Sequence, residues 1–107
     1  MLYTKRGNVM RPINEEKVIH NLGQLGDNYG LLVLAKLSNK EQEQRIILSE
    51  LEHYNQHMIK QSLELLVENQ FLQVRIEEIM PPNIYYKLTE QGALLIPVLE
   101  QIEALKI

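Results

Sequence analysis

The chain has 107 residues, of which 45% are hydrophobic and 23% charged, a composition typical of one soluble globular domain. It contains no cysteine, which excludes disulfides, thiolate metal sites and cysteine-based redox sensing. The net charge is −3, which by itself argues weakly against a nucleic-acid partner. The N-terminus lacks the apolar run of a signal peptide and no window is apolar enough to span a membrane, so we expect a cytoplasmic protein without a membrane partner.

Basic residues are concentrated at the N-terminus. The first seventeen residues have a net charge of +2, which leaves −5 for the remainder. Residues 1–12 are therefore predicted to form a basic N-terminal arm that ends at Pro12 and precedes one domain, residues 13–107. Such an arm either holds phosphate locally or is a frayed terminus solvated by its charge, and both interpretations stay open.

The domain is predicted to begin with an amphipathic helix. Asn14 precedes two glutamates, an arrangement typical of an N-cap and an acidic first turn, and the helix runs to about Leu22. The apolar side chains on its inner face are Val18, Ile19 and Leu22. The glycine-containing residues 23–30 then break the helix.

Two more helices are predicted before the centre of the chain. Residues 31–37, LLVLAKL, are too apolar for a surface strand and favour a short buried helix. Residues 38–41 match a capping box, in which Ser38 accepts a hydrogen bond from the backbone N–H of Glu41. The helix that follows this box is predicted to end near residue 52, with three apolar side chains facing inward, Ile47, Leu48 and Leu51.

The second half of the chain changes period twice. Asn55 is predicted to cap a helix that continues to about Asn69, with an apolar stripe opposite a polar one. Residues 71–79 alternate like a strand, residues 80–83 form a turn, and residues 84–88 form the return strand. Thr89 then caps a last helix, Gly92 removes bulk where helix and sheet meet, and Pro97 is predicted to bend that helix without ending it.

Four helices, a hairpin and a final helix describe a winged helix-turn-helix. The predicted fold class is therefore α+β, mainly α, a winged helix-turn-helix with an added C-terminal dimerisation helix. The recognition helix is expected at about 55–69, the wing at about 71–88 and the dimerisation helix at about 90–106.

From about Leu22 to Leu105 the chain resembles the HxlR-type winged-helix transcriptional regulators of bacteria and archaea. The segment LGDNYGLLVLAKL is similar to the family's Gly-rich turn and Leu-rich helix, and YNQHMIKQSLELLVENQFL to its recognition helix. The most specific part is MPPNIYYKLTEQGALLIPVL, which resembles the wing, second strand and dimerisation helix. The resemblance implies a homodimeric DNA-binding regulator that reads a pseudo-palindromic operator in double-stranded DNA.

The chain departs from the family pattern at several positions. Residues 15–17 replace the neighbourhood in which some members carry a sensing cysteine, and Tyr29 stands where a tryptophan is usual. SNKEQEQR replaces a Gly-Pro turn and suggests a longer helix, and the wing has Asn83 where a basic residue is common. The alternative function is a winged-helix protein-interaction module that has lost strong DNA binding.

The candidate DNA contacts lie on the front of the recognition helix, where residues 55–63 contain no acid, and on the wing. Amide, imidazole and ammonium groups can contact base edges or phosphates. The candidates are Asn55, Gln56, His57, Lys60 and Gln61 on the helix and Arg75, Asn83 and Lys87 on the wing. A solvated polar face is the alternative for the helix, and a cross-strand pair with Glu77 or Glu78 is the alternative for Arg75.

The last helix is apolar over a wider arc than one small core requires, which predicts a homodimer across it. The predicted interface combines the first and last helices and consists of Val18, Ile19, Leu22, Leu95, Val98, Leu99, Ile102 and Leu105. A two-fold axis would place two recognition helices one DNA turn, ~34 Å, apart.

No catalytic, metal or cofactor site is predicted. His53 and His57 are four residues apart but lie on either side of the Asn55 cap, so they do not share a helical face. No residues match a nucleophile with its base, a phosphate-binding glycine loop or paired catalytic carboxylates. The sequence does not indicate an inducer, an operator sequence or the sign of regulation.

Overall fold

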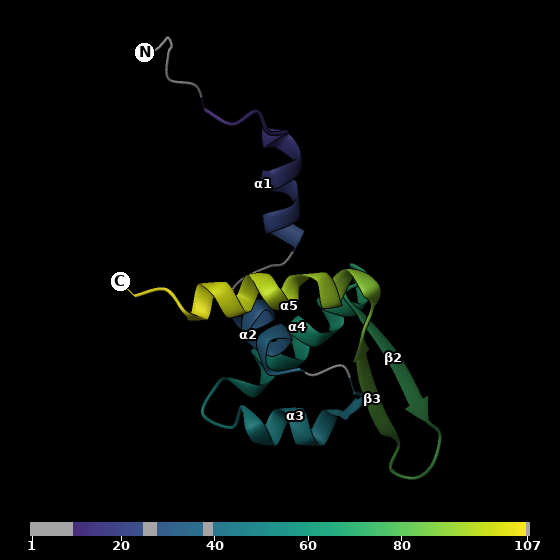
Figure 1. Cartoon of the computed structure of the whole chain (residues 1–107). Coiled ribbons are helices and arrows are strands. Elements are labelled where there is room, and N and C mark those ends of the chain that lie inside the picture. Colours follow the sequence, from purple (N-terminus) through teal and green to yellow (C-terminus); the bar gives the residue numbers. More distant parts are fainter. Residues whose placement is uncertain (1–9, 25–27, 38–39, 107) are drawn as a thin grey trace.

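The structure is a computed structural model that describes residues 10–24, 28–37 and 40–106. This part of the chain contains five helices and three strands (Figure 1). In chain order they are α1 (Glu15–Gln24), α2 (Asn28–Lys36), β1 (Gln42–Glu43), α3 (Gln44–Glu50), α4 (Gln56–Glu68), β2 (Leu72–Glu77), β3 (Asn83–Leu88) and α5 (Glu90–Glu103). The predicted mainly helical winged helix-turn-helix is confirmed. None of the described helices has the length and apolar character of a membrane-spanning segment.

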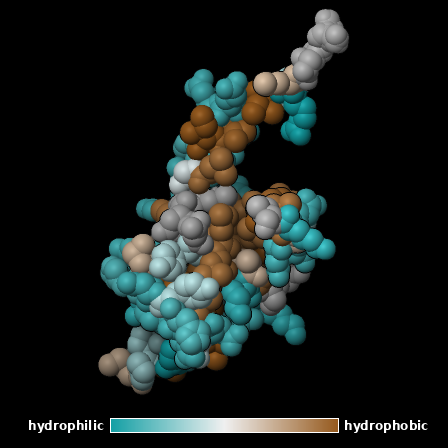
Figure 2. Space-filling model, turned by 90° about the vertical axis from the view of Figure 1, so that its left-hand side faces the viewer, coloured by the Kyte–Doolittle hydropathy of each residue, from teal (hydrophilic) through white to brown (hydrophobic). Residues whose placement is uncertain are grey.

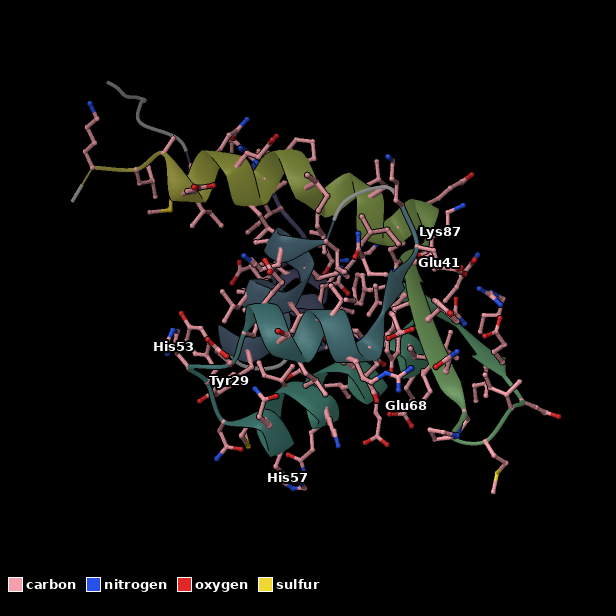
Figure 3. The ribbon with its side chains drawn as sticks, turned by 90° about the horizontal axis from the view of Figure 1, so that it is seen from below. Tyr29, Glu41, His53, His57, Glu68 and Lys87 are labelled. Atoms are coloured by element: carbon pink, nitrogen blue, oxygen red, sulfur yellow. The ribbon has the colours of Figure 1, made fainter. Side chains whose placement is uncertain are left out.

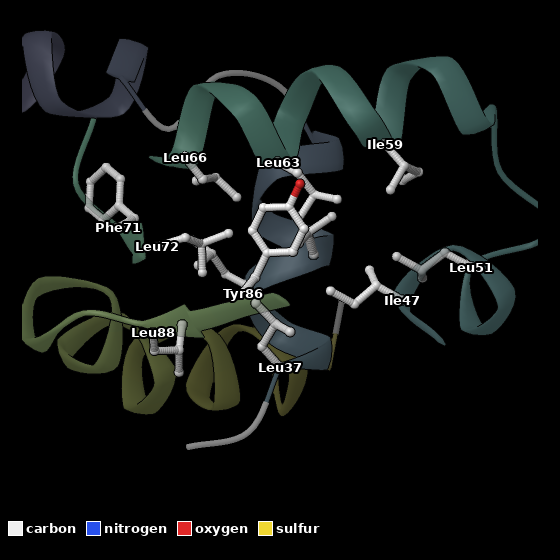
Figure 4. Close-up of a cluster of buried hydrophobic side chains, with 12 residues drawn as sticks. Leu37, Ile47, Leu51, Ile59, Leu63, Leu66, Phe71, Leu72, Tyr86 and Leu88 are labelled. Atoms are coloured by element: carbon white, nitrogen blue, oxygen red, sulfur yellow. The ribbon is translucent and has the colours of Figure 1, made fainter. Parts of the chain in front are cut away.

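The core lies where α2 and α4 pack against the inner face of the sheet (Figure 4). Leu34 of α2 and Ile59 and Leu63 of α4 have no exposed surface, and Leu66 completes the inner stripe predicted for α4. Phe71, Leu72, Tyr86 and Leu88 cover the core from the hairpin side. Each fully buried aliphatic side chain contributes about 1.5–3 kcal/mol relative to exposure, so this cluster holds α4 against the sheet.

The sheet is antiparallel, with the strand order β1-β3-β2. In the hairpin Val74 pairs with Tyr86 and Arg75 with Tyr85, so alternate residues face opposite sides of the sheet. Tyr86 and Leu88 point into the core, whereas Tyr85 and Lys87 belong to the outer face. The outer face of the wing, defined as residues 72–88, therefore carries most of its polar side chains.

The segment before α3 differs from the prediction. Gln42 and Glu43 form strand β1, paired with Tyr86 and Tyr85, and α3 begins only at Gln44. The predicted long helix from the capping box is therefore wrong, because the free edge of β3 offers these residues a backbone partner that local propensity does not reveal. Ser38, the proposed cap, lies outside the described residues.

The switch from β3 to α5 was predicted correctly. Thr89 Oγ1 accepts from the backbone N–H of Gly92 at 3.0 Å and donates to the carbonyl oxygen of Gln70 at 2.7 Å. A Cβ atom on Gly92 would lie 2.2 Å from the carbonyl oxygen of Phe71, so only glycine lets the helix approach so closely. Beyond this junction α5 runs through Pro97 to Glu103.

Helix α1 stands away from the rest of the chain (Figure 1). It forms as predicted, and Asn14 Oδ1 accepts from the N–H of Lys17 at 3.0 Å. None of its residues is buried, and the side chains of Val18, Ile19 and Leu22 are 43%, 71% and 61% exposed. The prediction that these three face inward is therefore wrong within the described part of the chain, because all three side chains are exposed there.

Candidate nucleic-acid interface

Helices α3 and α4 and the wing form the candidate interface, and the turn between the two helices is held by side chains. Asn55 Oδ1 accepts from the backbone N–H of Met58 at 3.1 Å, which confirms the predicted N-cap. The amide of Gln56 donates to the carbonyl oxygens of Leu51 at 3.0 Å and Tyr54 at 3.3 Å. These bonds determine where α4 begins and in which direction it leaves the turn.

Helix α4 presents its polar stripe to solvent. His57, Lys60 and Gln61 are exposed, and His57 points away from the body at the N-terminal end of the helix (Figure 3). The acids of this helix, Glu64 and Glu68, lie in its rear half. The N-terminal half therefore offers an ammonium, an imidazole and an amide beside the partial positive charge of the helix end, an arrangement that suits a phosphate or a base edge.

The structure gives Asn55 and Gln56 structural roles. The Asn55 side chain caps α4, and the Gln56 amide nitrogen is engaged with the turn. Of the five candidate contacts on the helix, the three with side chains that make no such bond to the turn are His57, Lys60 and Gln61. These three side chains therefore remain candidate contacts, whereas Asn55 and Gln56 orient the helix.

Arg75 of the wing is paired with Glu41, a partner that was not predicted for it. Its Nε and Nη2 atoms donate to the two carboxylate oxygens of Glu41 at 3.0 and 2.7 Å, and its guanidinium carbon lies 4.3 Å from the centre of the Tyr85 ring. Glu77 lies further off, at 3.9 Å from Nη1. The hydrogen bonds from Arg75 lower the pKa of Glu41, and the positive charge of Lys87 adds to this shift. Lys87 itself is exposed on β3 near Glu41 (Figure 3).

Arg45, in the first turn of α3, is a second basic residue beside the wing, near the end of the strands that carries the turn. Its Nε donates to Glu43 at 3.0 Å, and its Nη2 donates to the side-chain oxygen of Asn83. The amide nitrogen of Asn83 in turn donates to Glu77 at 2.8 Å. Arg45 was not predicted as a candidate contact, because the sequence suggests a long helix here and gives no sign of contact with a wing residue 38 positions away.

Gln44 links the start of α3 to the buried side of the wing. Its amide donates to the hydroxyl of Tyr86 at 3.0 Å, and burial raises the pKa of that tyrosine. Together with the bond between Arg45 and Asn83, this contact ties the first helix of the helix-turn-helix to β3. The orientation of the wing relative to the helices is thus set by polar contacts as well as by the core.

The predicted dimer residues divide into two groups. Val98, Ile102 and Leu105 of the α5 segment are exposed, as is the apolar stripe of α1, whereas Leu95 and Leu99 are half-buried and pack against the core. Hydrophobic residues gather on α1 and in a band below it (Figure 2). An apolar groove of about 730 Å³ between α2 and α5 is lined by side chains that include Leu31, Leu32, Ile96, Leu99 and Ile102. Exposed apolar surface of this extent is typical of an interface.

Comparison with known proteins identifies a family. The model of the HxlR-like helix-turn-helix family matches residues 24–106. No curated protein matches the chain.

Several solved structures share the fold. One is assigned to the MarR family of transcriptional regulators, from Porphyromonas gingivalis W83; it is 18% identical, with 87% of this chain and 93% of that one covered and a TM-score of 0.77. The reduced form of the transcriptional regulator YodB from B. subtilis is 23% identical, with 90% of each chain covered and a TM-score of 0.68. The regulator YtfH from Salmonella typhimurium is 21% identical, covers 80% and 77%, and has a TM-score of 0.70. At these identities the similarity establishes the fold.

Proposed function

The chain belongs to the HxlR-like helix-turn-helix family, a family of DNA-binding transcriptional regulators, and we propose that it binds a pseudo-palindromic operator as a homodimer. The observation that carries the proposal is the exposed front of α4, which contains no acid and is oriented by the Asn55 cap and the Gln56 amide. A capped helix that projects donors from its N-terminal half matches the way recognition helices enter the major groove.

On α4 the three free polar side chains have different expected roles. Lys60 supplies a point charge for a phosphate or for the acceptor atoms of guanine. Gln61 can form two hydrogen bonds with adenine, and His57, nearest the helix N-terminus, contacts a phosphate or a base edge. Base contacts by Gln61 would determine sequence preference, whereas phosphate contacts by Lys60 would determine affinity.

The wing adds few phosphate contacts in this proposal. Lys87 is exposed on β3, but Arg75 and Asn83 are both hydrogen-bonded within the chain, to Glu41 and Glu77 respectively. Arg11, exposed before α1, extends the basic arm, whose residues 1–9 lie outside the described part. Two protomers with few cations each would bind DNA with moderate affinity and clear salt dependence.

The dimer would form through α1 and the outer face of α5. The apolar stripes of these two helices are exposed in the single chain, and α1 has no buried residue. A two-fold axis through such a surface buries both stripes and presents two copies of α4 to successive turns of the major groove.

Lys60→Ala tests the DNA contact. We expect this variant to bind the DNA upstream of the protein's own coding region more weakly. Because one phosphate contact is lost, the slope of log affinity against log salt concentration should fall by about 1 for each protomer. Fluorescence anisotropy at two or more salt concentrations measures both quantities. Lys106→Ala, which removes the same charge beyond α5, is the control and should bind like the wild type.

A protein-interaction module is the second candidate, favoured by the net charge of −3 and by the pairing of Arg75 and Arg45 with carboxylates of the same chain. If the folded wild-type dimer fails to bind any DNA at low salt, this second candidate replaces the first.

A further inference from the structure

Arg75 on the wing and Arg45 beside it are both engaged by carboxylates of the same chain. We propose that Glu41, Glu43 and Glu77 withhold Arg75 and Arg45 from DNA phosphates, so that this wing network (Glu41, Glu43, Arg45, Arg75 and Glu77) sets the DNA affinity below what the arginines alone would give. The inference rests on the proposed DNA-binding function and concerns the regulation of the same site.

The Arg75 half of the network is bidentate. Both carboxylate oxygens of Glu41 receive a hydrogen bond, at 2.7 and 3.0 Å, and the Tyr85 ring lies under the guanidinium at 4.3 Å. Parallel N–H···O bonds of this kind match the geometry that an arginine uses to bind a phosphate. Glu41 therefore occupies the hydrogen-bonding groups that a phosphate would require.

The Arg45 half has two acceptors. Glu43 accepts from Nε at 3.0 Å, and the side-chain oxygen of Asn83 accepts from Nη2. Asn83 also donates to Glu77 at 2.8 Å, which keeps its oxygen directed at Arg45. Asn83, which stands where a basic wing residue is common, thus accepts a hydrogen bond from Arg45 of α3.

The charge and exposure of the network would allow a DNA phosphate to replace the carboxylates as partners of the two arginines. Glu41, Glu43 and Glu77 carry three negative charges against the two positive charges of Arg75 and Arg45, so these five residues have no net positive charge. The side chains of Arg75 and Arg45 are 52% and 60% exposed. Exposed ion pairs of this kind stabilise a fold only weakly, so a DNA phosphate can compete for these arginines. The glutamates oppose that exchange because they also repel the phosphate backbone.

Glu41 has the largest expected effect, because it takes two of the hydrogen bonds of Arg75 and lies near Lys87. Glu41→Gln removes the charge and keeps the side-chain volume. We expect its DNA affinity at about 0.1 M salt to rise roughly three- to tenfold, and the salt slope to steepen by about 1 for each wing as one more phosphate is contacted.

A double-mutant cycle separates release of Arg75 from a general change in charge. Arg75→Gln should reduce the DNA affinity of the Glu41→Gln protein by more than it reduces the DNA affinity of the wild type. The reason is that Arg75 is released from Glu41 only in the Glu41→Gln protein. Glu16→Gln, which makes the same charge change on α1 far from the wing, is the control and should leave the affinity unchanged.

The outcomes distinguish this inference from the function on which it rests. If the wild type binds DNA and a folded Glu41→Gln protein binds equally well or more weakly, the network positions the wing and the inference is wrong. If neither protein binds at low salt, the proposed function fails and the inference fails with it. Should Glu41→Gln unfold, Glu43→Gln applies the same test to Arg45.

Discussion

Among single residues, Gly92 is the one on which the junction between β3 and α5 depends, because it has no side chain. Thr89 turns the backbone from strand to helix by accepting from the N–H of Gly92 and donating to the carbonyl oxygen of Gln70. Its own N–H donates to the carbonyl oxygen of Phe71 at 3.1 Å. That same carbonyl oxygen would lie 2.2 Å from a Cβ atom on Gly92. The close approach of α5 to the start of β2 therefore requires glycine at this position.

Gly92→Ala should therefore destabilise the fold. We expect a loss of about 1–3 kcal/mol in the free energy of unfolding, because backbone atoms rather than a flexible side chain must move. For a domain of this size each 1 kcal/mol lowers Tm by roughly 4–8 °C. Thermal unfolding followed by circular dichroism, at matched protein concentration, measures the shift.

Gly23→Ala is the matched control, since a Cβ atom there would have no neighbour within 4 Å and the residue lies in the last turn of α1. Its Tm should stay the same or rise slightly, because alanine favours helix by up to about 1 kcal/mol over glycine. An equal loss in both variants would mean that helix propensity, and not close packing at residue 92, requires the glycine.

At the scale of elements, α4 is oriented by its first two residues and held by its inner stripe. Asn55 caps the helix, the Gln56 amide bonds to the preceding turn, and Leu63 with its apolar neighbours is buried against α2 and the sheet. Beyond Gln56, the described contacts give the side chains of the polar stripe no structural hydrogen bond. The charge of Glu64, in the rear half of the helix, adds to the effect of burial in raising the pKa of Tyr86. Stability and recognition thus use different faces of one helix.

Two substitutions at Asn55 separate these roles. Asn55→Ala should lower the free energy of unfolding by about 0.5–2 kcal/mol, because the Met58 N–H loses its acceptor. Asn55→Asp should keep the stability, since aspartate caps equally well, but should weaken DNA binding because a carboxylate at the helix N-terminus repels phosphate. Urea denaturation and DNA titration of both proteins measure the two effects. Unchanged DNA binding by the aspartate variant would place the end of α4 away from the phosphates.

In the molecule as a whole, two apolar surfaces of the described chain are exposed to solvent. The stripe of α1 and the outer face of α5 are exposed, although side chains of the same chemical kind are buried elsewhere in the domain. Burial of apolar surface is favourable at about 25 cal/mol per Å², so a second protomer that covers both stripes is a physically economical arrangement. In the proposed dimer the helix after the wing would couple the two recognition helices.

Val98→Glu should convert the proposed dimer into a monomer, because a carboxylate would be buried without a partner at the centre of the α5 surface. Sedimentation velocity measures the change, and binding to a two-half-site operator should weaken in parallel. Ile76→Glu is the control, since Ile76 is similarly exposed but lies on the wing. Val98 is a better probe than Leu99, which packs against the core of its own protomer. A Val98→Glu protein of unchanged size would contradict the α5 interface.

Most of the fold could be predicted from local sequence signals. The caps at Asn55 and Thr89, the inner stripe of α4 and the hairpin around residues 80–83 were all identified correctly. Each depends on residues within a few positions of one another, where hydrogen-bond reach and helical or strand period are determined by the chain itself. The candidate residues on α4 are exposed, as the helical period predicts for the same reason, and their contact with DNA stays a prediction.

Local signals in the sequence predict the five helices and the hairpin, their order and the residues that begin and end most of them. Only the folded chain shows that residues 42–43 pair as a strand with β3, that Arg75 bonds to Glu41 across 34 residues, and that the α1 stripe is exposed in the described part of the chain. The physical reason is that a cap or a period is satisfied within one or two turns. A charged side chain or a free strand edge bonds instead with whichever group the packed core brings within reach.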